Sequence, residues 1–199
     1  MPWEKQFDKN EVLCRAERAF WSGGYEATSM ADLLEQMGIQ KGSFYATFGS
    51  KRRILLDALE AYIRNRFTAF GALTKEKSPC AALERHLRQL ADEAAGPAGN
   101  WGCFVVNTAL ELAPRDEEVR ALVQRTFDAH VKLYCTLLDA AKAKGEVNAD
   151  LDSPQTAWGL HALVLGMRVL SRASMPRAAI YAVRDQALGL LGKKPVDPA

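Results

Sequence analysis

A short run of polar and aromatic side chains near residue 45 has the chemistry needed to contact nucleic-acid bases and phosphates. The spacing predicts a short helix at about residues 41–47, and the residues that face outward on it or directly precede it are Gln40, Lys41, Ser43, Tyr45 and Thr47. Their side chains donate hydrogen bonds or present an aromatic face, as base edges and phosphate oxygens require. A carboxylate-rich face would instead repel phosphates.

The local charge supports the same chemistry. Between Glu35 and Asp57 the chain has no acidic residue. The positive charges in that interval belong to Lys41, Lys51, Arg52 and Arg53. Over all 199 residues the 26 basic and 24 acidic residues leave a net charge of only +2, so a nucleic-acid binder must concentrate its basic residues in one place. The free N–H groups of a helix beginning at Lys51 would also suit a phosphate.

The elements that position these residues are two short helices separated by Gly38. Thr28 or Ser29 can cap the first helix, and Asp32 stands three residues after Ser29 as in a capping box. The side chains spaced to hold the two helices together are Leu33, Met37, Ile39 and Phe44. Helix-turn-helix layouts and basic runs occur in many folds, so the pattern alone leaves both DNA binding and a merely solvated face open.

Most of the remaining chain has helical periodicity, which predicts an all-α fold of about nine helices. Glycines and prolines separate the helices, and residues 96–100 form the clearest loop. We expect a DNA-binding helix-turn-helix domain at 1–50, a ligand-sensing and dimerisation domain at 51–192 and a disordered tail at 193–199.

Several classes of protein are not expected. The N-terminus has no secretory signal, and the most apolar stretch, Trp158–Leu170, is too short to span a bilayer, so a cytoplasmic protein without membrane association is predicted. The four cysteines lack metal-ligand spacing and are interpreted as free thiols. The three histidines, His86, His130 and His161, are interpreted as isolated on different predicted helices, and no catalytic constellation is present. We expect no enzyme, metal or cofactor; a purely structural helical adaptor is a further alternative.

The N-terminal motifs resemble those of the tetracycline-repressor (TetR) family over about residues 8–60. The matching residues are Ala19-Phe20, Gly24 to Ser29, Asp32 to Leu34, Gly38 to Tyr45, Phe48 and Ser50-Lys51. The resemblance implies a DNA-binding regulator, with repression as the expected sign. It also implies that Ser29 and Met30 begin a supporting helix near the DNA backbone, and that Lys41, Ser43 and Tyr45 enter the major groove or clamp its phosphates. Gln40, Gly42 and Thr47 are expected to be DNA-binding residues as well. It implies that Lys51 holds a phosphate. Ala46 and Thr47 depart from the usual aromatic and histidine, so one or two backbone contacts are in doubt.

One reading helix binds weakly, so such proteins pair to read two half-sites of a palindromic operator. The Trp158–Leu170 helix is apolar on more than one face: one stripe consists of Leu160, Leu163, Val164 and Met167, and a second of Ala162, Leu165 and Val169. One stripe can pack on the chain's own core and the other on a partner. The resemblance implies a four-helix bundle formed by the last two helices of each chain. The residues predicted for this interface are Leu160, Val164, Met167, Ile180, Val183, Ala187 and Leu191. The alternative is a helix buried on all sides within one chain.

The resemblance further implies an unknown small-molecule effector that releases the DNA from a cavity in the C-terminal helices. The candidate lining residues combine aromatic rings with a few polar groups: Trp101, Cys103, Phe104, Asn107, Phe127, Tyr134, Trp158 and His161. Core packing explains most of them equally well.

Cys103 suggests an alternative, covalent switch. The stretch Gly102 to Glu111 resembles a TetR subgroup of N-ethylmaleimide-responsive, electrophile-sensing repressors, in which the cysteine after this glycine is the reactive one. A position at a helix N-terminus lowers a thiol pKa and favours the thiolate. The alternative is a small buried apolar residue, the commonest fate of a free cysteine.

Overall fold

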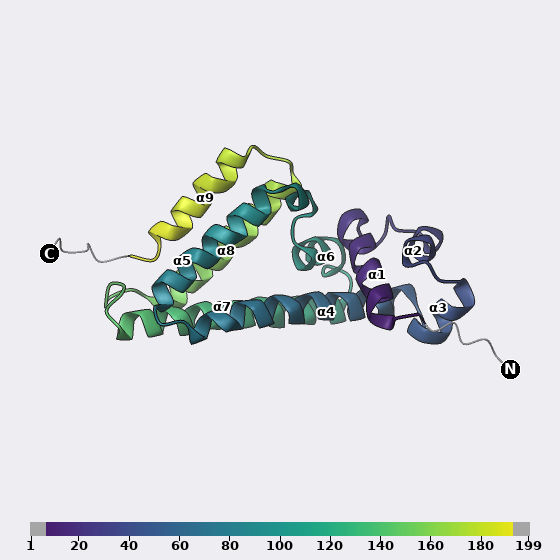
Figure 1. Ribbon diagram of the computed structural model, residues 1–199, viewed down its shortest axis with the longest axis horizontal. Coiled ribbons are helices and arrows are strands. Elements are labelled where there is room, and N and C mark those ends of the chain that lie inside the picture. Colours follow the sequence, from purple (N-terminus) through teal and green to yellow (C-terminus); the bar gives the residue numbers. More distant parts are fainter. Residues whose placement is uncertain (1–6, 193–199) are drawn as a thin grey trace. The chain divides into compact units, whose positions relative to one another are not determined.

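The computed structural model describes residues 7–192, and the predicted disordered tail at 193–199 lies outside these residues. The described chain forms nine α-helices and two short 3₁₀-helices, which confirms the all-α prediction (Figure 1). It divides into two compact units. The first unit extends to Asn65 and also contains Phe104–Arg120; the second contains Arg66–Cys103 and the chain from Ala121 onward. The first unit therefore reaches beyond the predicted boundary at residue 50.

The first unit contains the predicted helix-turn-helix. Its helices are α1 (Lys9–Gly23), α2 (Met30–Met37), α3 (Lys41–Phe48), the first part of α4 (Lys51–Gly71) and α6 (Phe104–Leu112). Leu33, Met37 and Phe44 are fully buried, as predicted for residues that hold α2 and α3 together. Gly38 ends α2 with φ 70° and ψ 29°, a left-handed conformation that a residue with a Cβ adopts only at a cost.

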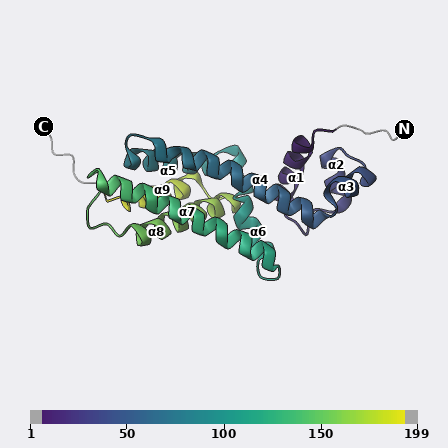
Figure 2. The ribbon, with the colours of Figure 1, turned by 90° about the horizontal axis from the view of Figure 1, so that it is seen from below.

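The second unit consists of the rest of α4, α5 (Pro79–Ala95), most of α7 (Glu117–Ala143), α8 (Ser153–Arg172) and α9 (Arg177–Gly189). Helices α5, α8 and α9 pack pairwise against one another, as Figure 2 shows from below. The short helix η1 (Ala72–Lys75) follows α4. Tyr134, Leu138, Leu160 and Leu191 lie in the core of this unit.

The segment after α5 differs from the predicted open loop, because Pro97–Trp101 forms the 3₁₀-helix η2. Gly99 is buried in it, and an added Cβ would stand 2.0 Å from the Ala94 carbonyl oxygen. The hydroxyl of Ser171 on α8 donates a 2.6 Å hydrogen bond to that same carbonyl. The loop residues are thus packed against α5 and α8, which the glycine- and proline-rich composition did not indicate.

Candidate functional site

The reading helix α3 presents the side chains that the sequence predicted. Lys41, Gly42, Tyr45 and Thr47 are exposed, whereas Phe44 and Phe48 are buried. Ser43 is partly exposed. Gln40 is exposed as well, and its side chain makes no capping hydrogen bond to α3. The predicted outward face of this helix is therefore confirmed as a surface; its contact with DNA stays a prediction.

The N-terminus of α2 has the predicted capping box. The Ser29 hydroxyl accepts a 3.1 Å hydrogen bond from the Asp32 backbone N–H, and the Asp32 carboxylate accepts one of 3.1 Å from the Ser29 N–H. The side-chain hydrogen bond from Ser29 is the main cause that lowers the Asp32 pKa. Met30, the first residue of the helix, is partly buried. The capping box fixes the N-terminus of α2, which is the end predicted to lie near the DNA backbone.

Three basic residues at the start of α4 have different surroundings. Arg52 donates to Asp116 at 2.9 and 3.0 Å and to Glu118 at 2.7 Å, and this pairing holds the Asp116 pKa at about 2. Arg53 pairs with Asp57 at 2.9 Å. The Lys51 ammonium instead lies 4.2 Å from the centre of the Tyr25 ring.

The acid-free interval in the sequence is therefore not acid-free in space, because α7 begins beside Arg52. Carboxylates neutralise both arginines in part, whereas Lys51 lies on an aromatic face that leaves its charge in place. The contact of Lys51 with a phosphate stays a prediction.

Family comparisons agree with this geometry. Residues 12–58 match the family model described as bacterial regulatory proteins, tetR family, and residues 79–187 match the one described as tetracyclin repressor-like, C-terminal domain. The second match alone spans more than half of the chain. The chain belongs to the TetR family. TetR-family proteins are DNA-binding transcription regulators and not enzymes.

Relatives and solved structures extend over nearly the whole chain. It is 29% identical to the HTH-type transcriptional repressor ComR of Escherichia coli strain K12, with 84% of this chain and 81% of ComR covered. It is 31% identical to the regulator YezE of Bacillus subtilis strain 168, with 94% and 97% covered. The fold superposes with a TM-score of 0.83 on a cysteine mutant of the TetR-family regulator CifR complexed with 26-bp double-strand operator DNA, at 29% identity and coverage of 95% and 98%. Reduced Escherichia coli NemR shares the fold at 18% identity, with a TM-score of 0.81 and coverage of 94% and 98%.

In the second unit, aromatic and imidazole rings from four helices form one cluster, which we call the histidine cluster. Its members are Phe67 and Phe70 of α4, His86 of α5, Phe127, His130 and Tyr134 of α7, and Trp158 and His161 of α8. The stacked rings of His130 and His161 have centroids 5.6 Å apart, and His86 stacks on Phe70 at 4.3 Å. The interpretation of the histidines as isolated is wrong, because helix packing brings all three together.

The cluster keeps its histidines neutral. Burial lowers the pKa of His86, His130 and His161 to about 4 in each case, and the neighbouring His130 lowers that of His161 further. Within residues 7–192, the buried Nε2 of His161 finds no hydrogen-bond partner. Although three imidazoles gather here, residues 7–192 contain no group of three or more histidine, cysteine or acidic side chains placed to hold a metal ion.

The predicted effector residues belong to both units of the chain. Phe127, Tyr134 and His161 belong to the histidine cluster, and Trp158 lies at its edge with 52% of its surface exposed. Phe104 and Asn107 lie in the first unit: the Phe104 ring packs on Tyr62, and the Asn107 amide is 3.5 Å from the Trp21 carbonyl oxygen. That these residues line one effector site stays a prediction.

Trp101 and Cys103 are both partly buried and lie at the end of η2 and directly before α6, respectively. Cys103 therefore occupies the predicted position before a helix, while its reactivity stays a prediction. The other cysteines differ: Cys14 is exposed, Cys80 is buried and Cys135 is intermediate, with burial raising the pKa of the Cys135 thiol.

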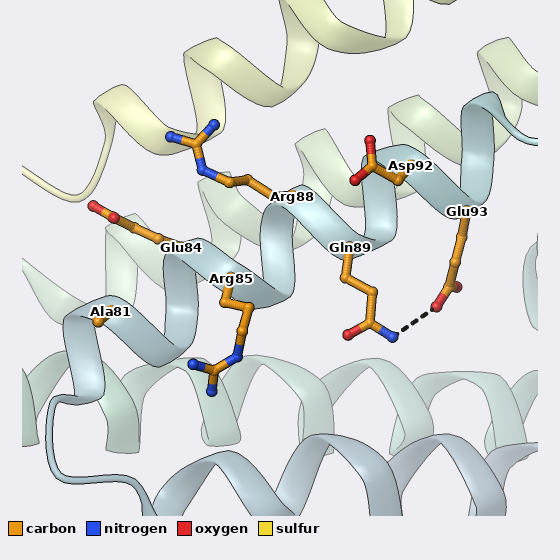
Figure 3. Close-up of a pocket in the computed structure, with 7 residues that line it drawn as sticks. All are labelled: Ala81, Glu84, Arg85, Arg88, Gln89, Asp92 and Glu93. Atoms are coloured by element: carbon orange, nitrogen blue, oxygen red, sulfur yellow. Dashed lines mark hydrogen bonds between the residues drawn. The ribbon is translucent and has the colours of Figure 1, made fainter.

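A groove of about 480 Å³ runs along the outer side of α5 (Figure 3). Glu84, Arg88 and Asp92 project to one side of the helix, and Arg85, Gln89 and Glu93 project to the other. The groove is lined almost wholly by charged and polar side chains, and most of them are exposed. Such a surface is typical of a solvated helix face and lacks the apolar enclosure of a small-molecule site.

The predicted dimer interface requires a correction. Leu160, Met167, Ile180, Ala187 and Leu191 have at most 2% of their surface exposed within a single chain, so they are core residues and have no surface left for a partner. Val164 and Val183 are partly buried. The apolar residues that face outward on α8 belong to the other stripe.

That second stripe consists of Ala162, Leu165 and Val169, and Trp158 lies one turn before them on the same face. Trp158 and Val169 are 52% and 47% exposed, Ala162 is exposed and Leu165 is partly exposed. The spacing of four, three and four residues aligns them on one face of the helix.

No helix in the part of the chain that the structure describes is both long and apolar enough to cross a membrane.

Proposed function

We propose that this TetR-family protein binds a palindromic operator as a homodimer and represses transcription until an effector releases it. In this proposal Lys41, Ser43 and Tyr45 of α3 contact bases or flanking phosphates in the major groove, with Gln40, Gly42 and Thr47 beside them. Ser29, Met30 and Lys51 approach the backbone. The observation that carries the proposal is the exposed, donor-rich face of α3 on a buried Leu33–Met37–Phe44 core. Since chromosomal DNA is the partner, we expect the protein in the cytoplasm.

Fluorescence anisotropy with DNA from upstream of the protein's own gene tests the reading face. Lys41→Ala and Tyr45→Ala should each weaken specific binding by about tenfold, since one charge-assisted contact contributes roughly 1.5–3 kcal/mol. Lys132→Ala removes the same charge from an exposed site on α7 in the other unit and is the matched control. Equal binding by all four proteins would refute the assignment.

For the dimer, we propose that the exposed stripe of Trp158, Ala162, Leu165 and Val169 faces its counterpart in the second chain. The support is the continuous apolar face on α8, together with the fact that TetR-family regulators are dimers. Val169→Arg should convert the dimer to a monomer in light scattering and abolish operator binding. Leu110→Arg makes the same kind of change at a 74% exposed leucine of α6 and should stay dimeric. A Val169→Arg protein that remains dimeric would exclude this face.

For the effector, we propose the histidine cluster as the binding region. The buried and unpartnered His161 Nε2 among aromatic rings suits a small molecule with an apolar ring and one hydrogen-bonding group. A panel of small phenols, followed by thermal shift and operator release, should yield binders to the parent protein that fail to bind His161→Leu. The absence of any binder, or equal shifts in both proteins, would reject the cluster.

A covalent switch at Cys103 is the alternative, because this thiol is partly exposed directly before α6. N-ethylmaleimide should then release operator from the parent protein and leave Cys103→Ser bound. Release from the serine variant as well would exclude this thiol as the switch.

A further inference from the structure

The turn between α1 and α2 is held by a carboxylate that lies 85 residues away in the sequence. Glu111 on α6 accepts a 2.9 Å hydrogen bond from the Tyr25 N–H through one oxygen and a 2.7 Å bond from the Glu26 N–H through the other. Helices α6 and α1 pack against each other, as Figure 1 shows. A bidentate, charge-assisted contact of this kind fixes both the position and the orientation of the turn.

The approach of Glu111 depends on the glycine that ends α1. Gly24 has φ 86°, and an added Cβ would stand 3.2 and 3.5 Å from the two Glu111 oxygens. Arg115, one turn after Glu111, adds a 3.5 Å ion pair to Glu26. The carboxylate therefore lies directly against the backbone of the turn, where a Cβ at position 24 would be in tight contact with it and would also have an unfavourable φ.

The residue held by Glu111 in turn supports Lys51. The Tyr25 ring lies beneath the Lys51 ammonium at 4.2 Å, and it packs on Phe20 at 5.9 Å on the α1 side. Glu26 is three residues before Ser29, the cap of α2. The contact of Glu111 with this turn thus influences the starts of α2 and α4, the two helix ends predicted to contact phosphates. Its influence is most direct on Lys51.

We infer that Glu111 is a positioning residue for DNA binding: it holds the Tyr25 ring under Lys51 and so places the ammonium for its phosphate. The inference rests on the proposed role of Lys51 as a phosphate contact. The segment that carries Glu111, residues 104–120, belongs to the first unit, while the chain on either side of it belongs to the second. Any displacement of this segment must either move Tyr25 with it or break the hydrogen bond between Tyr25 and Glu111.

The test compares operator binding at several salt concentrations for Glu111→Gln, Lys51→Ala and the double variant. In Glu111→Gln an NH2 donor replaces one of the two carboxylate oxygens and cannot accept from the N–H that faces it. We expect each single variant to weaken binding by roughly tenfold and to lower the salt slope by about one per half-site, as the loss of one phosphate contact requires. The double variant should bind no worse than Lys51→Ala, because both changes remove the same contact.

The matched control is Glu117→Gln, which removes the same charge at an exposed carboxylate that pairs with Arg120. Binding of Glu111→Gln at the level of Glu117→Gln, or losses that add in the double variant, would overturn the inference. If Lys51→Ala itself binds like the parent protein, the proposed phosphate contact fails and the inference fails with it.

A second variant keeps the inference testable if Glu111→Gln does not fold. Tyr25→Leu retains both backbone hydrogen bonds to Glu111 and removes only the ring beneath Lys51. It should reproduce the loss in affinity and in salt slope, with no further loss when combined with Lys51→Ala. Parent-like binding by Tyr25→Leu would contradict the inference.

Discussion

The histidine cluster should make the stability of the protein depend steeply on pH between neutrality and pH 5. The folded chain holds the pKa of His86, His130 and His161 at about 4, whereas the ordinary value is about 6.5. Between these values the unfolded chain binds more protons than the folded one. The free energy of unfolding is therefore highest above the ordinary pKa and falls as the pH drops towards 4.

The magnitude follows from the size of the shifts. One imidazole with these two pKa values costs roughly 2 kcal/mol at pH 5 relative to neutral pH. Three would cost about 6 kcal/mol. Because His86 and His130 are partly exposed, hydration reduces the free-energy cost of these two rings, and about 3–6 kcal/mol is expected in total. That is a large share of the roughly 5–15 kcal/mol that stabilises an ordinary domain.

Urea unfolding at about pH 7.5, 6 and 5 measures this dependence, in a range above that in which the carboxylates titrate. His161→Gln should reduce the loss between pH 7.5 and 5 by about 2 kcal/mol, because it removes one titrating ring. Phe127→Leu, which removes a neighbouring ring that cannot titrate, should lower stability equally at every pH. Equal stability of the parent protein at pH 7.5 and 5, or an unchanged slope in His161→Gln, would refute the account of the cluster.

Two further predictions concern local structure. Ser29→Ala removes the hydroxyl that accepts the Asp32 N–H and should lower the free energy of unfolding by about 1 kcal/mol in urea titrations, with weaker operator binding; an unchanged value would contradict the cap. Gly99→Ala should destabilise by more than about 2 kcal/mol, because its Cβ would clash with the Ala94 carbonyl. Gly166→Ala in α8, where an added Cβ meets nothing within 4 Å, should be neutral or slightly stabilising in the same urea titrations.

The local features of the head were predictable because each depends on a few adjacent residues. Ser29 and Asp32 form their capping box within one turn, and Gly38 ends α2 through its own φ. The burial of Leu33, Met37 and Phe44 follows from helical periodicity. These signals come from residues that lie close together in the sequence, so no tertiary information was needed to find them.

The contacts that join distant segments were not predictable from spacing. The hold of Glu111 on Tyr25, the pairing of Arg52 with Asp116 and the meeting of His86 with His130 each depend on how helices pack. Their partners lie 86, 64 and 44 residues apart in the sequence. A single chain without its relatives carries no signal for such pairs.

The choice between the two apolar stripes of α8 shows a different limit. Leu160 and Met167 on one stripe, and Ala162 and Val169 on the other, have similar hydrophobicity, so periodicity finds both and ranks neither. Packing against α5 and α9 decides the matter, since it buries Leu160 and Met167 of the first stripe. The interface prediction was wrong for its buried members because it selected the stripe that the chain uses for its own core.

The most direct test of the central claim is a DNase I footprint of the purified protein on the DNA upstream of its own gene. The account predicts one protected palindromic segment, with half-site centres about 10 bp or a multiple of it apart. Lys41→Ala should lose this protection at a protein concentration that saturates the parent. Protection without sequence preference, or an identical footprint in Lys41→Ala, would contradict the claim that the exposed face of α3 reads the operator.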